Sequence, residues 1–262
     1  MNNNPIGIFD SGIGGITIYK EIHSLMPKES IIYLADSKNS PYGIKSKEEI
    51  VALSFKNTRL LLDKGCKLIV VACNTASTNA VKELRNNFDI PFIRIQPAIK
   101  PAALQSKTKV VGILATESTL SSDLYYETSQ KFAQGVQVIE QKGNGIVSLI
   151  ESGKMYSFEM DQLLKDYIHP MLEKNIDNLV LGCTHYPLLR SEIEKVAGEK
   201  VNIIDSGEAI ARQTMNILKM ENLITDNTYK STQSFYINKN SNVFQQLLNR
   251  FNKNFIAEKI NF

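Results

Sequence analysis

Short apolar runs alternate with longer amphipathic stretches along most of the chain. The apolar runs end at small or polar residues, which is typical of buried strands. The predicted strands are 5–9, 30–35, 68–72, 91–95, 109–115, 136–141, 178–181 and 201–204. Most intervening stretches place apolar residues at helical spacing, as Ile50, Leu53, Leu60 and Leu61 do. The predicted helices are 16–26, 46–64, 74–87, 120–134, 158–175 and 208–220.

Strands that alternate with helices predict parallel sheets built from βαβ units. Pro97 and Pro101 bracket a break, which we take as a domain boundary. We therefore expect an α/β fold of two similar domains with mostly parallel sheets and the active site in the cleft between them. The first domain is expected to be discontinuous: residues 1–97 and 208–262 form it, and residues 98–207 form the second.

The chain after Asn222 is polar and rich in asparagine. It contains one predicted strand at 235–237 and one predicted helix at 243–251. We recognise no catalytic or binding motif in this tail, so the sequence predicts no functional role for it.

Two cysteines follow apolar runs in the same way. The segment LIVVACNTAS carries Cys73 directly before Asn74 and Thr75, and LVLGCTHYP carries Cys183 directly before Thr184 and His185. Each cysteine is thus predicted to lie at the carboxyl end of a parallel strand, where open α/β sheets bind their ligands. The repetition indicates that the two thiols work as a pair.

Composition limits the class of protein. The chain has 262 residues, of which 43% are hydrophobic and 22% charged, as in ordinary globular proteins. A net charge of +3 is too small to favour nucleic acid or a membrane surface as a partner. No apolar run approaches the roughly 20 residues of a membrane span, and the first residues do not resemble an export signal. With 3 cysteines and no disulfide framework, we expect free thiols in the cytoplasm.

Four interpretations of the cysteine pair remain open at this point. The thiols could be small buried core residues. Cys183 and His185 could ligate a metal, although the paired ligand spacing of zinc sites is lacking. A disulfide oxidoreductase normally has Cys-x-x-Cys, which the chain does not contain. The fourth interpretation is a pair of acid/base groups that remove a proton from one face of a carbon and return it to the other.

The two cysteine segments also carry a family resemblance. Together with GIFDSGIGG and DSKNSPYG they resemble the glutamate racemases of bacterial cell-wall synthesis, within the aspartate/glutamate racemase superfamily. PAIKPA at 97–102, ILATEST at 113–119 and IIDSGEAIA at 203–211 match in the same order. The resemblance implies an enzyme with two α/β domains that uses neither pyridoxal phosphate nor a metal.

The resemblance further implies the site residues. The expected catalytic residues are Cys73, Cys183, Asp10, His185 and Glu151, with Glu151 holding His185. The expected substrate-binding residues are Asp10, Ser11, Pro41, Tyr42, Gly43, Asn74, Thr75, Thr119, Thr184 and His185, and no metal ligands are expected.

The chemistry fits these residue types. An amino-acid α-proton is very weakly acidic, and a free thiol has a pKa of about 8.5, so each thiol needs help to act as a base. The amino terminus of the helix that follows each cysteine offers partial positive charge. Asp10 beside Cys73 and His185 beside Cys183 are expected to orient or carry the proton.

The resulting hypothesis is cofactor-independent interconversion of L- and D-glutamate, which supplies D-glutamate for peptidoglycan. Expected partners are the small-molecule substrate and a second copy of the chain in a homodimer, with no nucleic acid and no membrane. The alternatives are a racemase for aspartate or another small amino acid, and a non-catalytic binding module on the same fold.

Overall fold

Two parallel sheets form the framework of the protein. The computed structural model describes residues 2–226 and 230–262. The six-stranded sheet has the order β10 (Ala257–Lys259), β9 (Gln233–Ile237), β2 (Ile31–Ala35), β1 (Ile6–Asp10), β3 (Leu68–Val71) and β4 (Phe92–Arg94). The four-stranded sheet has the order β6 (Gln137–Lys142), β5 (Val110–Ala115), β7 (Asn178–Gly182) and β8 (Asn202–Ile204). All strand pairs among the described residues are parallel.

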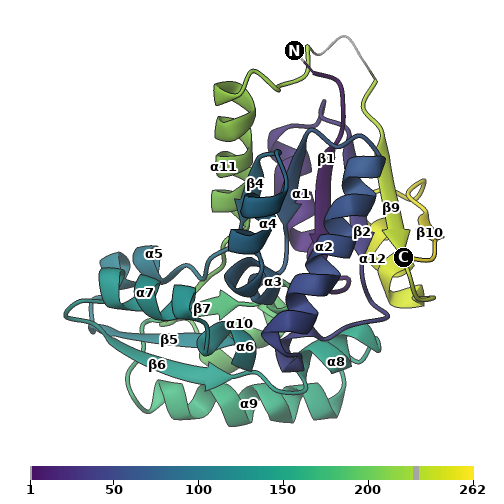
Figure 1. Ribbon diagram of the computed structural model, residues 1–262. Helices are drawn as coiled ribbons and strands as arrows, with labels where there is room; N and C mark the ends of the chain where they lie inside the picture. The colour runs from purple at the N-terminus through teal and green to yellow at the C-terminus, as the bar shows by residue number, and fades with distance from the viewer. Residues whose placement is uncertain (1, 227–229) are drawn as a thin grey trace.

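Helices connect and cover these strands. The α-helices are α1 (Ile16–Leu25), α2 (Lys47–Asp63), α3 (Asn74–Asn79), α4 (Val81–Asn87), α5 (Ile99–Gln105), α6 (Glu117–Leu120), α7 (Asp123–Phe132), α8 (Ile146–Glu151), α9 (Phe158–Leu172), α10 (Arg190–Ala197), α11 (Gly207–Met220) and α12 (Asn242–Phe251). Two 3-10 helices are η1 (Tyr42–Ile44) and η2 (Tyr186–Leu189). Figure 1 shows the six-stranded sheet in the upper part of the molecule and the four-stranded sheet across the lower part.

The predicted fold class is confirmed, because the chain is α/β with two parallel sheets. The strands of the six-stranded sheet come from both ends of the chain, and those of the other sheet come from its middle. The domain limits of 1–97 with 208–262, and 98–207, stay a prediction.

Several predicted elements differ in detail. The helix expected over 74–87 is divided at Ala80, which ends α3 and begins α4. Asn79 explains the break, because its side chain donates to the carbonyl of Thr75 at 2.9 Å and so competes with the backbone ladder. The break expected between Pro97 and Pro101 instead contains the start of α5. Pro101 is accommodated because it lies in the first turn, where its missing N–H has no helical partner.

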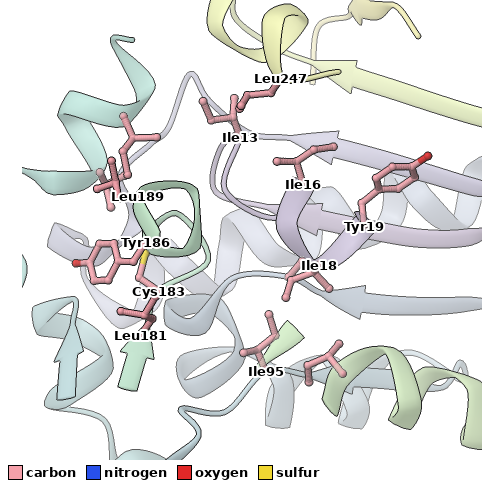
Figure 2. Close-up of a cluster of buried hydrophobic side chains, with 14 of the residues drawn as sticks. Ile13, Ile16, Ile18, Tyr19, Ile95, Leu181, Cys183, Tyr186, Leu189 and Leu247 are labelled. Carbon is pink, nitrogen blue, oxygen red and sulfur yellow. The ribbon is translucent and has the colours of Figure 1, made fainter. Parts of the chain in front are cut away.

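One hydrophobic cluster passes from sheet to sheet. It contains Ile8 from β1, Ile16 from α1, Leu181 from β7 and Tyr186 from η2, all buried. Figure 2 shows Cys183 within this cluster, between Leu181 and Tyr186. The end of β7 that carries Cys183 is therefore packed against the core of the six-stranded sheet, which fixes one strand end relative to the other sheet.

A buried ion pair ties the amino-terminal ends of the strands together. Lys67, just before β3, contacts Glu29 at 2.7 Å, and the exposed fractions of their side chains are 0% and 2%. Lys67 also donates to the carbonyl of Asn2, and the second oxygen of Glu29 accepts from the N–H of Thr225. The pair therefore joins the amino-terminal segment and the segment after α11 to the centre of the sheet.

We predict that Lys67→Ala lowers the free energy of unfolding by about 3–5 kcal/mol, because it leaves the Glu29 carboxylate buried without its counter-charge. Urea denaturation followed by circular dichroism measures this change. Lys82→Ala, on the exposed face of α4, is the control and should change stability by less than about 0.5 kcal/mol. Equal losses in the two variants would contradict the structural role of the pair.

Candidate active site

Cys73 lies immediately beyond β3 and caps α3. It has an extended backbone, and its sulfur accepts a hydrogen bond from the N–H of Ala76 at 3.4 Å. Its thiol faces the hydroxyl of Ser11 at 3.6 Å. Burial raises the pKa of the Cys73 thiol, and the nearby charge of Asp10 raises it further. In these surroundings Cys73 is therefore a neutral thiol, able to donate a proton.

Cys183 occupies the equivalent place after β7, and a buried relay stands behind it. Its sulfur is 3.9 Å from Nδ1 of His185, and Nε2 of His185 is 2.7 Å from a carboxylate oxygen of Glu151. Burial alone would lower the pKa of His185, but its hydrogen bonds to Cys183 and Glu151 hold that pKa well above its ordinary value. The imidazole is therefore an imidazolium that donates to Glu151 and presents Nδ1–H to the sulfur.

Glu151, the last residue of α8, crosses to the other sheet. The oxygen that contacts His185 also accepts the N–H of Ile13 at 2.7 Å, and its second oxygen accepts the hydroxyl of Ser37 at 3.0 Å. The close approach depends on glycine at position 12, since a Cβ there would lie 1.9 Å from the Glu151 oxygen. Glu151 thus both orients His185, as expected, and joins the two halves of the site.

Asp10 lies at the end of β1 and is 0% exposed. One carboxylate oxygen accepts the N–H of Gly15 at 2.8 Å, and the hydroxyl of Thr184 lies 3.4–3.5 Å from the two oxygens. Burial raises the pKa of Asp10 to about 6, although the positive charge of His185 acts in the opposite direction. A group with this pKa can exchange a proton near neutral pH.

The two cysteines line one small cavity. Its lining residues are Ser11, Pro41, Tyr42, Gly43, Cys73, Asn74, Thr75, Thr116, Val147, Cys183, Thr184 and His185. The space left for a small molecule is only about 10 Å³, which is room for about one water. The structure therefore shows the site in a closed form.

Most of the predicted residues meet at this cavity. Three of them do not line it: Asp10 and Glu151 stand behind the thiol and imidazole, and Thr119 lies behind Thr116, with their hydroxyls 2.8 Å apart. Two lining residues were not predicted. Thr116 had a signal, since it belongs to the ILATEST motif, whereas Val147 is an aliphatic residue that no motif distinguishes.

The polar groups of the cavity wall differ in whether they are free to form hydrogen bonds with a ligand. Asn74 Nδ2 is buried and has no hydrogen-bond partner among the described residues, so it is free to bind a ligand. The hydroxyl of Tyr42 is committed, because it donates to Asp36 at 2.5 Å and accepts from Asn57 at 3.2 Å. Burial and the charge of Asp36 raise the pKa of Tyr42 well above its ordinary value, which keeps it a neutral donor. Tyr42 therefore contributes its ring and backbone to the wall.

A larger groove of about 1080 Å³ lies elsewhere, between α4, α5 and α11. It is lined by neither Cys73 nor Cys183.

Within residues 2–226 and 230–262, no group of three or more His, Cys, Asp or Glu could hold a metal ion. None of the helices described there combines the length and apolar character needed to cross a bilayer.

Known proteins are similar to this chain in sequence. A model of the Asp/Glu/hydantoin racemase family matches residues 6–214. A glutamate racemase from Herpetosiphon aurantiacus is 47% identical over 228 residues, which cover 87% of this chain and 90% of that protein. The chain belongs to the glutamate racemases of this family. As a racemase it is an isomerase, so the alternative of a non-catalytic binding module is set aside.

Solved structures agree over the full length. A glutamate racemase isoform from Bacillus anthracis is 31% identical to this racemase, with a TM-score of 0.89, and the match covers 100% of this chain and 99% of that one. A glutamate racemase from Francisella tularensis, solved in complex with D-glutamate, has a TM-score of 0.84 at 30% identity, covering 100% and 98%. The fold, including the tail outside the family model, is therefore that of known racemases.

The raised pKa of Asp10 makes a prediction about stability. Because the folded state holds the proton more tightly than the unfolded chain, the ionised carboxylate destabilises the fold above pH 6 by about 3 kcal/mol, and this cost disappears as the pH falls toward 3.8. Asp10→Asn, which still accepts from Gly15, should be more stable than the wild-type racemase by about 3 kcal/mol at pH 8 and by about half of that at pH 5.

Urea unfolding at both pH values measures this difference, with the exposed Asp89→Asn as control. A variant that is less stable than wild type at pH 8, or a gain that does not shrink at pH 5, would contradict the cost assigned to Asp10.

Proposed function

We propose that this racemase interconverts L- and D-glutamate, with Cys73 and Cys183 acting on opposite faces of the α-carbon. One observation carries the proposal: both thiols line a single cavity although β3 and β7 belong to different sheets. A planar carbanion formed between two such groups can lose a proton to one thiolate and gain one from the other thiol. By family resemblance, Cys73 serves D-glutamate and Cys183 serves L-glutamate.

Each thiol has a titratable neighbour that suits proton transfer. Asp10 acts on Cys73 through its charge and has a pKa of about 6, which is close to the working pH of a general base. His185 faces Cys183 with its charge stabilised by Glu151. The two relays differ in chemistry, so the two directions of the reaction use different helpers.

Neutral donors are proposed to hold the substrate carboxylates. Asn74 Nδ2 lacks a partner among the described residues, and the hydroxyls of Thr75 and Thr184 lie in the cavity wall. The first N–H groups of η1, at Tyr42 and Gly43, have no helical acceptor. Donors fixed in a buried site stabilise the negative charge that develops on the α-carboxylate when the proton leaves.

The proposed reaction needs neither pyridoxal phosphate nor a metal. A pyridoxal enzyme forms its Schiff base on a lysine, and no lysine is among the described lining residues. The chemistry then rests on the two thiols and their titratable neighbours.

Substrate entry requires the closed cavity to open. Thr75 and Thr116 meet across the rim with their hydroxyls 3.0 Å apart, and Thr116 comes from the other half of the site. We propose that separation of these residues admits glutamate and that their return excludes water during catalysis.

We propose that in the cell the protein is a cytoplasmic homodimer that supplies D-glutamate for peptidoglycan. The substrate class rests on the named relatives, and the hydroxyl-rich wall supports an acidic amino acid.

The direct test gives the purified protein D-glutamate in the presence of a metal chelator and no added cofactor. The optical rotation should fall to zero as the racemate forms, and aspartate, which is one methylene shorter, should react about a hundredfold more slowly at the same concentration. Faster turnover of aspartate would place the chain's activity with aspartate. Activity that is lost with chelator and restored by one metal would contradict the metal-free mechanism.

A second prediction concerns the two thiols. Cys73→Ser and Cys183→Ser should each abolish racemisation, because a serine hydroxyl is a far weaker acid than a thiol. Elimination of chloride from β-chloroalanine needs only one base, which removes the α-proton as chloride leaves. Cys73→Ser should therefore still process the L-enantiomer and Cys183→Ser the D-enantiomer, as measured by pyruvate release.

Cys66→Ser is the matched control, since Cys66 is buried among the side chains beside β3 and does not line the cavity. It should retain both activities. Loss of elimination from the same enantiomer in both site variants would contradict opposed bases.

A further inference from the structure

The loop of residues 36–44, here called the Asp36 loop, forms one wall of the cavity through Pro41, Tyr42 and Gly43. Its position depends on the hydroxyl of Tyr42, which donates to one carboxylate oxygen of Asp36 at 2.5 Å. Asp36 is 0% exposed, so whatever fixes this carboxylate also fixes Tyr42.

The carboxyl-terminal tail supplies a support for Asp36. Strand β9 pairs with β2 in a register that sets Ile237 beside Ala35, so the next residue, Asn238, lies beside Asp36. Asn238 Nδ2 donates to the second carboxylate oxygen of Asp36, and Asn238 Oδ1 accepts the N–H of Lys38 at 2.8 Å. Asn238 is only 6% exposed, so water does not readily replace these bonds.

We propose that Asn238 is a positioning residue for glutamate binding, a role that rests on the proposed function. It holds Asp36 and the start of the loop, Asp36 holds the Tyr42 hydroxyl, and Tyr42 sets the backbone of Gly43 against the substrate. Asn238 lies outside residues 6–214, which the family model matches. The asparagine-rich tail, which composition left without a role, thereby contributes to the site.

The amide of Asn238 meets two needs at once, because it both donates to Asp36 and accepts from Lys38. Alanine removes both bonds. Aspartate keeps the acceptor but replaces the donor with a second carboxylate oxygen facing Asp36. Asn39 still donates to Asp36 at 2.7 Å in either variant, so the fold retains a bond to this carboxylate while the loop loosens.

The test measures racemisation kinetics in both directions. Asn238→Ala should raise KM for D- and L-glutamate about tenfold, the effect of losing one well-formed hydrogen bond in binding, with kcat within about threefold of wild type. Asn238→Asp should raise KM at least as much. Because the two enantiomers are equal in energy, kcat/KM must fall by the same factor in each direction.

Gln233→Ala is the matched control. Gln233 lies at the other end of β9, and its side chain donates to the carbonyl of Glu29 at 3.0 Å. The variant loses one hydrogen bond from the same strand without touching Asp36. A merely structural role for Asn238 would make the two substitutions equivalent, whereas the proposal expects Gln233→Ala to keep the wild-type KM.

Amide hydrogen exchange of the Asp36 loop provides a readout that does not need turnover. Exchange within residues 36–44 should accelerate in Asn238→Ala and Asn238→Asp but not in Gln233→Ala. A wild-type protein that leaves glutamate unchanged would contradict the proposed function, and the exchange data would still decide whether Asn238 holds the loop. Unchanged exchange, or a KM within twofold of wild type in both Asn238 variants, would overturn the inference.

Discussion

The site depends on one partly buried carboxylate, that of Glu151, which extends from α8 and is held by segments of the six-stranded sheet. Glu151 ends α8, which connects to β6 of the four-stranded sheet, yet it accepts hydrogen bonds from Ile13 and Ser37, which follow strands of the six-stranded sheet. The same carboxylate holds His185. A buried carboxylate is costly unless such donors surround it. Glu151 therefore joins the two halves of the site, and its hydrogen bond to Nε2 of His185 holds the imidazole beside Cys183.

The same burial that orders the site works against ionisation of its acids. It raises the pKa of the Cys73 thiol, which therefore keeps its proton, and it raises the pKa of Asp10 to about 6, so that Asp10 releases its proton only near neutral pH. Glutamate carries two carboxylates as well as its α-ammonium group, so in the proposed complex the ammonium favours the thiolate once the wall donors neutralise the carboxylates. Binding and activation of the thiol are then linked, and the unliganded protein carries the electrostatic cost of the arrangement in its stability.

The sequence pattern predicted those features that depend on local order. Cys73 and Cys183 were predictable at strand ends because each follows a buried apolar run, and eight other predicted site residues line one cavity with them. Features set by distant packing were not predictable. The donors of Ile13 and Ser37 to Glu151, and the support of Asp36 by Asn238, arise only when segments far apart in the chain come together. The break at Ala80 was not predicted, because the Asn79 side chain donates to the carbonyl of Thr75, a hydrogen bond that helical periodicity does not reveal.

The central claim, that two opposed thiols transfer different protons, is tested most directly by isotope incorporation. The racemase is given L-glutamate in deuterated water, and the α-carbon of each enantiomer is analysed by mass spectrometry during the first few per cent of conversion. Opposed bases predict that newly formed D-glutamate carries deuterium while the remaining L-glutamate keeps its original hydrogen. Newly formed D-glutamate that retains the original hydrogen would mean that one group removes and returns the same proton, which would contradict the account.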